Sequence, residues 1–151
     1  MVIKINSQVL EPTCTKNKKM EIDARKKMQF LDLYHMVIAD GIVHPKEMET
    51  LYRIGLENYG LTESEINESV KSAGVSTVIP ELPEERISVL YEMALIAWAD
   101  GVLEDSERNL LRRYAMKYGV DESSIDELSE FLFERAKNNA DVKDVIQELN
   151  N

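Results

Sequence analysis

Two Asp-Gly turns carry acidic side chains at a spacing that suits the binding of a cation. Each turn begins with Ala-Asp-Gly, continues with two aliphatic residues, and is followed by a Glu seven positions after the Asp. The carboxylates placed in this way are Asp40 and Glu47 at the first turn and Asp100, Glu104 and Glu107 at the second. Oxygen-rich ligand sets suit Ca²⁺ or Mg²⁺, so a divalent cation of the Ca²⁺ type is the predicted ligand, with the second turn as the better site. His44 would add a nitrogen ligand to the first turn.

The same aspartates also have a purely structural interpretation. Asp40 and Asp100 each lie at the C-terminal end of a predicted helix, where the helix dipole makes a negative charge unfavourable by about 0.3–1 kcal/mol. An Asp in such a place offsets this cost when it accepts hydrogen bonds from backbone N–H groups of the turn. A single His before a Pro, as at His44, is also typical of a surface residue or a helix cap. Capping and metal binding therefore both remain open on the residues alone.

Several other chemical sites are excluded by residue type and spacing. An EF-hand needs oxygen ligands at loop positions 1, 3 and 5 and a Glu at position 12, whereas aliphatic residues occupy positions 3 and 12 of both turns. The two His residues do not form the paired Glu-x-x-His motifs of a di-iron bundle, and the single Cys14 cannot build a zinc finger. The six Gly residues are isolated and form no phosphate-binding loop. We therefore expect no enzymatic activity and no cofactor other than the cation.

An internal repeat organises the chain around the two turns. The segment Ala39–Val43 recurs as Ala99–Leu103, sixty residues later, and Tyr59–Ser64 aligns with Tyr118–Ser123 after the loss of one residue. Eleven identities fall within twenty-seven aligned positions, which is far above chance and indicates a duplication.

Each copy is predicted to consist of three helices separated by glycine turns. Apolar residues recur at helical spacing, and Pro45 suits the first position of a helix. Gly55 lies within an apolar stripe and aligns with Ala115, so small residues at both places predict that two helix backbones approach closely. The second copy opens at Pro83 with a helix that is apolar nearly all round and runs to about Asp100, and we expect this helix to be central.

The predicted fold class is all-α, with about seven helices in two pseudo-repeated three-helix units packed on a single core. Residues 1–19 form a basic extension that is expected to be flexible, and residues 20–151 form the helical domain. Repeat 1 covers about 20–74, repeat 2 about 83–138, and a C-terminal helix capped by Asp141 about 141–149. A capping box at Thr62–Glu65 starts the third helix, which Gly74 closes.

The charge distribution limits the partners. The net charge is −10, but residues 1–29 carry +4 and the remainder carries −14. An acidic body repels phosphate backbones, so we expect no nucleic-acid partner. The basic segment could attract RNA or an anionic membrane surface, or it could be a solvated tail that docks on its own acidic body.

The apolar and cysteine content predicts where the protein resides. The longest nearly apolar run, Ile87–Ala99, is too short to span a bilayer, so no direct membrane insertion is expected. No signal peptide is visible, and a single Cys makes a reducing, cytoplasmic location the expected one.

The doubled Ala-Asp-Gly-aliphatic-aliphatic segment, with its Glu and a Leu four residues later, resembles the TerB-like family of tellurite-resistance and DjlA N-terminal-type domains. The resemblance covers roughly Phe30–Leu149, and its matching acidic positions are Asp40, Glu47, Asp100 and Glu107. It implies an all-helical, non-catalytic, bacterial cytoplasmic protein linked to tellurite and chemical-stress resistance. It also implies binding of Ca²⁺ or another divalent metal through acidic patches, and partnership with a membrane-bound TerC-like protein. The chain departs from the family in its basic, Cys-containing extension and in having His-Pro at the first turn where the second has Glu-Asp.

The sequence is compatible with three alternative functions. The leading one is a TerB-like module that binds a divalent metal at the Asp-Gly turns and acts through protein partners. The second is a metal-free adaptor whose turns are structural caps and whose acidic face binds a protein. The third is a hydrolase that uses the same carboxylates around a metal, which would need an open coordination position in a concave pocket.

Overall fold

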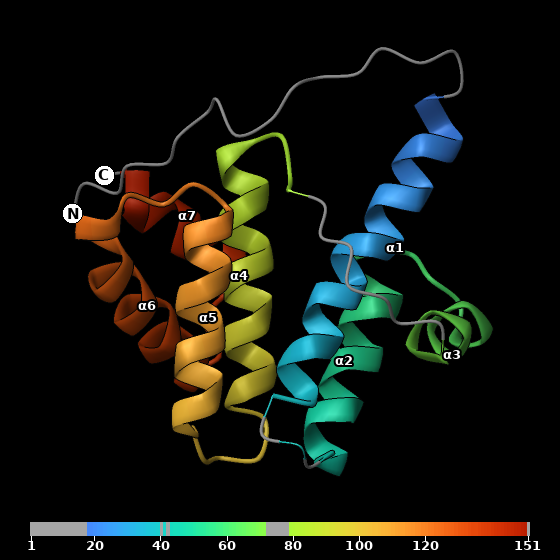
Figure 1. The fold of residues 1–151 in the computed structure, drawn as a ribbon, viewed down its shortest axis with the longest axis horizontal. Coiled ribbons are helices and arrows are strands. Elements are labelled where there is room, and N and C mark those ends of the chain that lie inside the picture. Colours follow the sequence, from blue (N-terminus) through green and yellow to red (C-terminus); the bar gives the residue numbers. More distant parts are fainter. Residues whose placement is uncertain (1–17, 40, 42, 72–78, 151) are drawn as a thin grey trace.

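The computed structural model describes residues 18–39, 41, 43–71 and 79–150. Within them the chain forms seven α-helices and no β-strand, which confirms the predicted all-α class (Figure 1). The helices are α1 (Lys18–Val37), α2 (Pro45–Glu57), α3 (Glu63–Lys71), α4 (Pro83–Ala97), α5 (Asp105–Lys117), α6 (Glu122–Lys137) and α7 (Val142–Asn150). None of these helices has an apolar stretch long enough to cross a membrane. The predicted basic extension, with Cys14, and the predicted helix end at Gly74 lie outside the described residues.

Helix α4 is the central element, as its all-round apolar sequence predicts. It stands between α1 and α2 on one side and α5, α6 and α7 on the other, and it packs against all five (Figure 1). Ten of its fifteen residues are buried. The helix ends at Ala97, three residues before the predicted end, because the chain tightens into a turn in which Ala99 and Gly101 donate hydrogen bonds three residues back.

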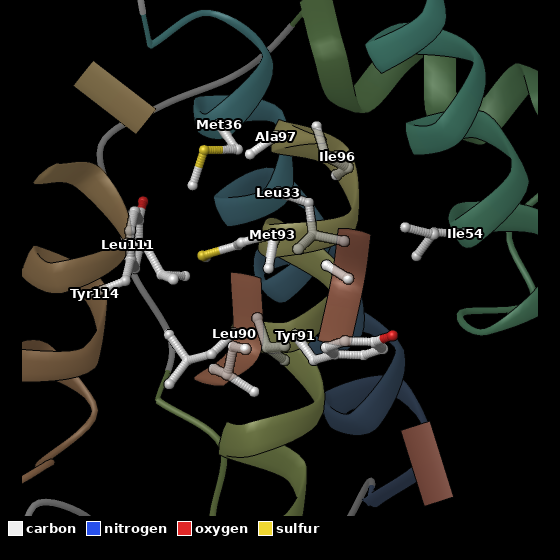
Figure 2. Packing of buried hydrophobic residues seen from close by; sticks show 14 of the residues in the cluster. Leu33, Met36, Ile54, Leu90, Tyr91, Met93, Ile96, Ala97, Leu111 and Tyr114 are labelled. Atoms are coloured by element: carbon white, nitrogen blue, oxygen red, sulfur yellow. The ribbon is translucent and has the colours of Figure 1, made fainter. Parts of the chain in front are cut away.

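A single hydrophobic core surrounds α4. Leu33 and Met36 of α1 meet Leu90 and Met93 of α4, and Leu111 of α5 approaches from the opposite side (Figure 2). All five side chains are at most 1% exposed. One continuous core of this kind holds both halves of the chain in one domain.

Local signals at the helix ends behave as predicted. The Thr62 N–H donates to Glu65 Oε1 at 3.2 Å, and the Glu65 N–H donates to Thr62 Oγ1 at 3.1 Å, which completes the capping box of α3. Asp141 Oδ1 accepts the Lys143 N–H at 2.8 Å at the start of α7. Pro45 and Pro83 each lie in the first turn of a helix, where a missing N–H costs little.

Gly55 makes a close contact, although not of the predicted kind. A Cβ built at Gly55 would lie 2.8 Å from Phe30 Cε1 and 2.8 Å from Ile66 Cδ1. The partners are therefore side chains of α1 and α3, whereas the sequence predicted a neighbouring helix backbone. A ring edge and an aliphatic tip fill the space beside α2, so the small residue accommodates bulky neighbours.

Replacing Gly55 with Ala is expected to destabilise the protein by about 1–2 kcal/mol. The added methyl group overpacks the core at a cost of about 1–3 kcal/mol, and the better helix propensity of Ala offsets up to about 1 kcal/mol of it. Urea unfolding followed by circular dichroism measures the difference. Ala115→Gly, at the aligned position of α5, should lose about 2 kcal/mol, because it lowers helix propensity and removes a buried methyl group. A stabilised Gly55→Ala variant would show that Phe30 and Ile66 move aside freely.

Two buried carboxyl groups connect the two halves of the chain. Asp32 of α1 accepts hydrogen bonds from the hydroxyl groups of Tyr118, at 3.0 Å, and Tyr114, at 3.3 Å. Glu92 of α4 accepts one from the Tyr59 hydroxyl at 3.1 Å and one from the Asn58 amide at 2.9 Å. Each acid therefore takes its tyrosine donor from the other half of the chain.

The two acids, and likewise their two tyrosine donors, occupy corresponding positions in the two halves of the sequence. Asp32 and Glu92 are sixty residues apart, the same interval that separates the two Asp-Gly turns, and Tyr59 aligns with Tyr118. The duplication itself remains an inference from the sequence. These hydrogen bonds join α1 to the residue that follows α5, and the residues that follow α2 to α4, so they hold the two halves together.

Burial changes the protonation of both acids. It raises the pKa of Asp32 to about 6, although the hydrogen bonds from Tyr118 and Tyr114 and the charge of Lys117 act in the opposite direction. It raises the pKa of Glu92 to about 7, against the hydrogen bonds from Asn58 and Tyr59. Both side chains are nearly inaccessible, at 0% and 6% exposed, so each carboxyl group stays protonated to a higher pH than an exposed one does.

Candidate functional site

The two Asp-Gly turns lie at the same end of the molecule. Helices α1 and α4 end there, and α2 and α5 begin there (Figure 1). Gly41 and Gly101 adopt positive φ angles of 80° and 83°, a conformation that glycine accepts without strain and that lets the chain reverse direction. The core packing of α1 and α2 against α4 therefore brings residues of one turn towards the other.

Three potential ligands converge between the turns. They are His44, which precedes α2, Glu47 in the first turn of α2, and Asp100, which follows α4. One ligand atom from each lies within 4.8 Å of the others. His44 Nδ1 and Asp100 Oδ2 are 3.6 Å apart, with side chains 28% and 21% exposed, whereas Glu47 is 1% exposed. The cluster therefore extends from the buried Glu47 to the partly exposed His44 and Asp100.

Asp100 uses its two carboxylate oxygens differently. Its Oδ1 accepts a hydrogen bond from the Val102 N–H at 3.0 Å, which is the turn cap of the structural interpretation. Its Oδ2 faces His44 across the gap between the turns. Capping and ligand binding are therefore compatible at this residue, because they employ different atoms.

Two further predicted ligands, Glu104 and Glu107, do not join this cluster. Glu104 is exposed and occupies the N-cap position of α5, and Glu107, in the first turn of α5, is 1% exposed. Neither belongs to a group of three ligand atoms within the described part of the chain. Asp40 lies outside the described residues. The sequence predicted that each turn would assemble its own ligands, but Asp100 instead approaches His44 and Glu47 of the other turn.

The ligand set has one nitrogen and two carboxylates. Such a mixed set suits Zn²⁺, Mn²⁺ or Fe²⁺, because imidazole binds borderline metals and carboxylates bind all three. Ca²⁺ takes six to eight oxygen ligands, which two carboxylates do not supply. Carboxylates that bind a metal do so in their ionised form, and their negative charge attracts a divalent cation. The donors present therefore fit a divalent transition metal or Zn²⁺ better than the predicted Ca²⁺.

The geometry of the His44, Glu47 and Asp100 cluster is the basis for a functional proposal. The cluster joins two turns that a shared sequence motif marks, and one of its carboxylates is buried. No family model, no curated protein and no solved structure matches the chain.

Proposed function

We propose that the protein is a non-catalytic helical module that binds one divalent cation between its two Asp-Gly turns, through His44, Glu47 and Asp100. The observation that supports this proposal is the convergence of the three ligand atoms within 4.8 Å. The TerB-like resemblance adds a wider proposal, in which the module acts through protein partners in a bacterial tellurite or chemical-stress response.

A cation in this place would connect two structural units. Glu47 belongs to α2, and Asp100 follows α4, so a bound ion would join the first half of the chain to the second. Binding to the folded state alone stabilises a protein by mass action, by about 2.7 kcal/mol when the ligand is at one hundred times its dissociation constant. Thermal unfolding therefore reports directly on the proposed site.

Saturating Zn²⁺ or Mn²⁺ at pH 7.5 is expected to raise the melting temperature by about 5–10 °C, the size that mass action gives for a chain of this length. Ca²⁺ and Mg²⁺ should raise it less. Differential scanning calorimetry makes the measurement, and a Cys14→Ser background removes the thiol as a competing ligand. The response should disappear in His44→Gln and in Asp100→Asn. The latter keeps an oxygen for the Val102 N–H and loses only the charge.

Glu104→Gln is the matched control, because Glu104 is an acidic turn residue that lies outside the cluster. This variant should keep the full metal response. A response lost in Glu104→Gln and kept in Asp100→Asn would contradict the cluster and favour the turn-by-turn sites predicted from the sequence. An unchanged melting temperature with all four cations would reject metal binding.

The metal-free adaptor is the second candidate, favoured by the hydrogen bond from Val102 to Asp100, which gives this carboxylate a structural role. Under this alternative a protein partner should remain bound in chelator, and Asp100→Asn should leave binding intact. A pull-down with and without EDTA distinguishes the two functions.

A further inference from the structure

A pocket of about 310 Å³ opens beside the end of α4, and its lining includes Ala99 and Gly101, which flank Asp100. Its polar lining residues are Thr50, Arg53, Trp98, Lys137 and Asn139. They come from α2, the end of α4 and the end of α6, and Leu95 supplies part of the apolar surface. The volume is at the lower end of the range for small-molecule sites.

The charged side chains that line this pocket are positive, whereas the protein as a whole is negative. The chain carries −10 overall, yet the pocket is lined by two cations, Arg53 and Lys137, and by no carboxylate. Within the described part of the chain, neither cation forms an ion pair. Lys137 lies in the last turn of α6, where a cation is favoured by the helix dipole. That explanation does not extend to Arg53, which lies within α2.

Trp98 contributes a second, independent observation. Its indole Nε1 is buried and finds no acceptor among the described protein atoms. A buried donor without an acceptor costs about 1–3 kcal/mol, so such groups are rare unless a ligand or water completes them. Lys137 Nζ lies 5.5 Å from the centre of the same ring, which places a positive charge beside the indole.

Asn139, which follows α6, provides a further polar side chain to the lining. Its φ angle of 53° is left-handed, a conformation that Asn adopts more readily than most residues at the end of a helix. The Thr50 hydroxyl already donates to the Lys46 carbonyl at 2.9 Å. The accessible donors are therefore those of Arg53, Lys137 and Asn139, whereas the buried indole N–H of Trp98 would be reached through a small shift of its surroundings.

We infer that this pocket binds the oxyanion group of a small organic molecule, a phosphate or a carboxylate, against the indole of Trp98. Guanidinium and ammonium groups form short charge-assisted hydrogen bonds with such oxygens, and the indole N–H adds a neutral donor. Asp100 itself does not line the pocket, although its neighbours Ala99 and Gly101 do, so the two proposed sites are adjacent and use different side chains.

The chain offers a direct probe because Trp98 is its only tryptophan. Fluorescence titrations in EDTA, at ionic strength held constant with chloride, would use inorganic phosphate, glycerol phosphate and citrate. We expect a saturable change in Trp98 emission with the two phosphates, with citrate, or with both. Which of these ligands binds shows whether the pocket takes a phosphate or a carboxylate. Isothermal titration calorimetry measures the same binding in Trp98→Phe, which keeps an aromatic ring but lacks the N–H donor, and affinity should fall.

Arg53→Gln and Lys137→Gln are each expected to weaken binding about tenfold, since each removes a charge-assisted contact. Arg113→Gln is the matched control: it removes the same charge from the aligned position of α5, and Arg113 is exposed and outside the pocket. Asn139→Gly keeps the left-handed backbone and tests the amide alone. All these side chains are exposed, so the fold should survive. Emission that changes equally with chloride, or equal affinities of Arg53→Gln and Arg113→Gln, would overturn the inference.

Discussion

Raising the pH from 5 to 8 is expected to lower the free energy of unfolding by several kcal/mol, because two carboxyl groups are buried. The pKa of Asp32 is raised from 3.8 to about 6, and that of Glu92 from 4.5 to about 7. Between the unfolded and folded pKa values, the folded state binds more protons than the unfolded state. The stabilisation is therefore complete below about pH 4 and is lost as the pH rises through 6 and 7. Shifts of this size correspond to about 3 kcal/mol for each group.

Urea unfolding at pH 5, 6, 7 and 8 measures this dependence. Glu92→Gln stays neutral at every pH and can still accept the Tyr59 hydroxyl, so its slope between pH 6 and 8 should be smaller than that of the wild-type protein. Asp32→Asn should flatten the slope mainly between pH 5 and 6.5. Glu104→Gln removes an exposed carboxylate and should leave the slope unchanged. A wild-type stability that rises from pH 5 to 8 would contradict the raised pKa values of the two acids.

Arg86→Lys is expected to destabilise the protein by about 2–4 kcal/mol, although it conserves the charge. The Arg86 side chain is 0% exposed. Its Nε donates to the Pro80 carbonyl at 2.7 Å and one terminal nitrogen donates to the Tyr118 carbonyl at 3.1 Å. A lysine has a single nitrogen at the end of a flexible chain, so at least one carbonyl loses its donor while the positive charge stays buried.

Arg135→Lys is the matched comparison for this prediction. Arg135 forms a paired hydrogen bond with Glu148 at 2.7–3.2 Å on the surface. Exposed ion pairs contribute little to stability, so the loss should be clearly smaller than that of Arg86→Lys. Chemical denaturation of the two variants in parallel measures the loss in free energy of unfolding that each substitution causes. Equal losses would mean that the Arg86 contacts are replaced by solvent or by a shift of the chain near Pro80.

The helices and their ends were predictable because their signals are local. The apolar spacing of α4, the capping box at Thr62 and the Asp141 cap each depend on residues within one or two helical turns, and each is present in the structure. The end of α4 was placed three residues late, since the tightening of the last turn has no separate mark in the sequence.

The candidate site was only partly predictable. Acidic residues at both turns were visible, but the approach of Asp100 to His44 depends on the angle at which α4 packs against α2, and no spacing along the chain encodes it. The buried acids were missed for a different reason. Asp32 and Glu92 resemble ordinary charged residues within helices, and the sixty-residue interval between them was the one signal that connected them to the repeat.

The exchanged tyrosine donors have a consequence for how the chain folds. Asp32 depends on Tyr118, and Glu92 depends on Tyr59, so each half buries an acid whose hydrogen-bond donor belongs to the other. Neither half can form its interior alone without leaving a polar group unsatisfied. The two halves should therefore acquire their native structure together, in a single all-or-none transition with no stable half-folded form.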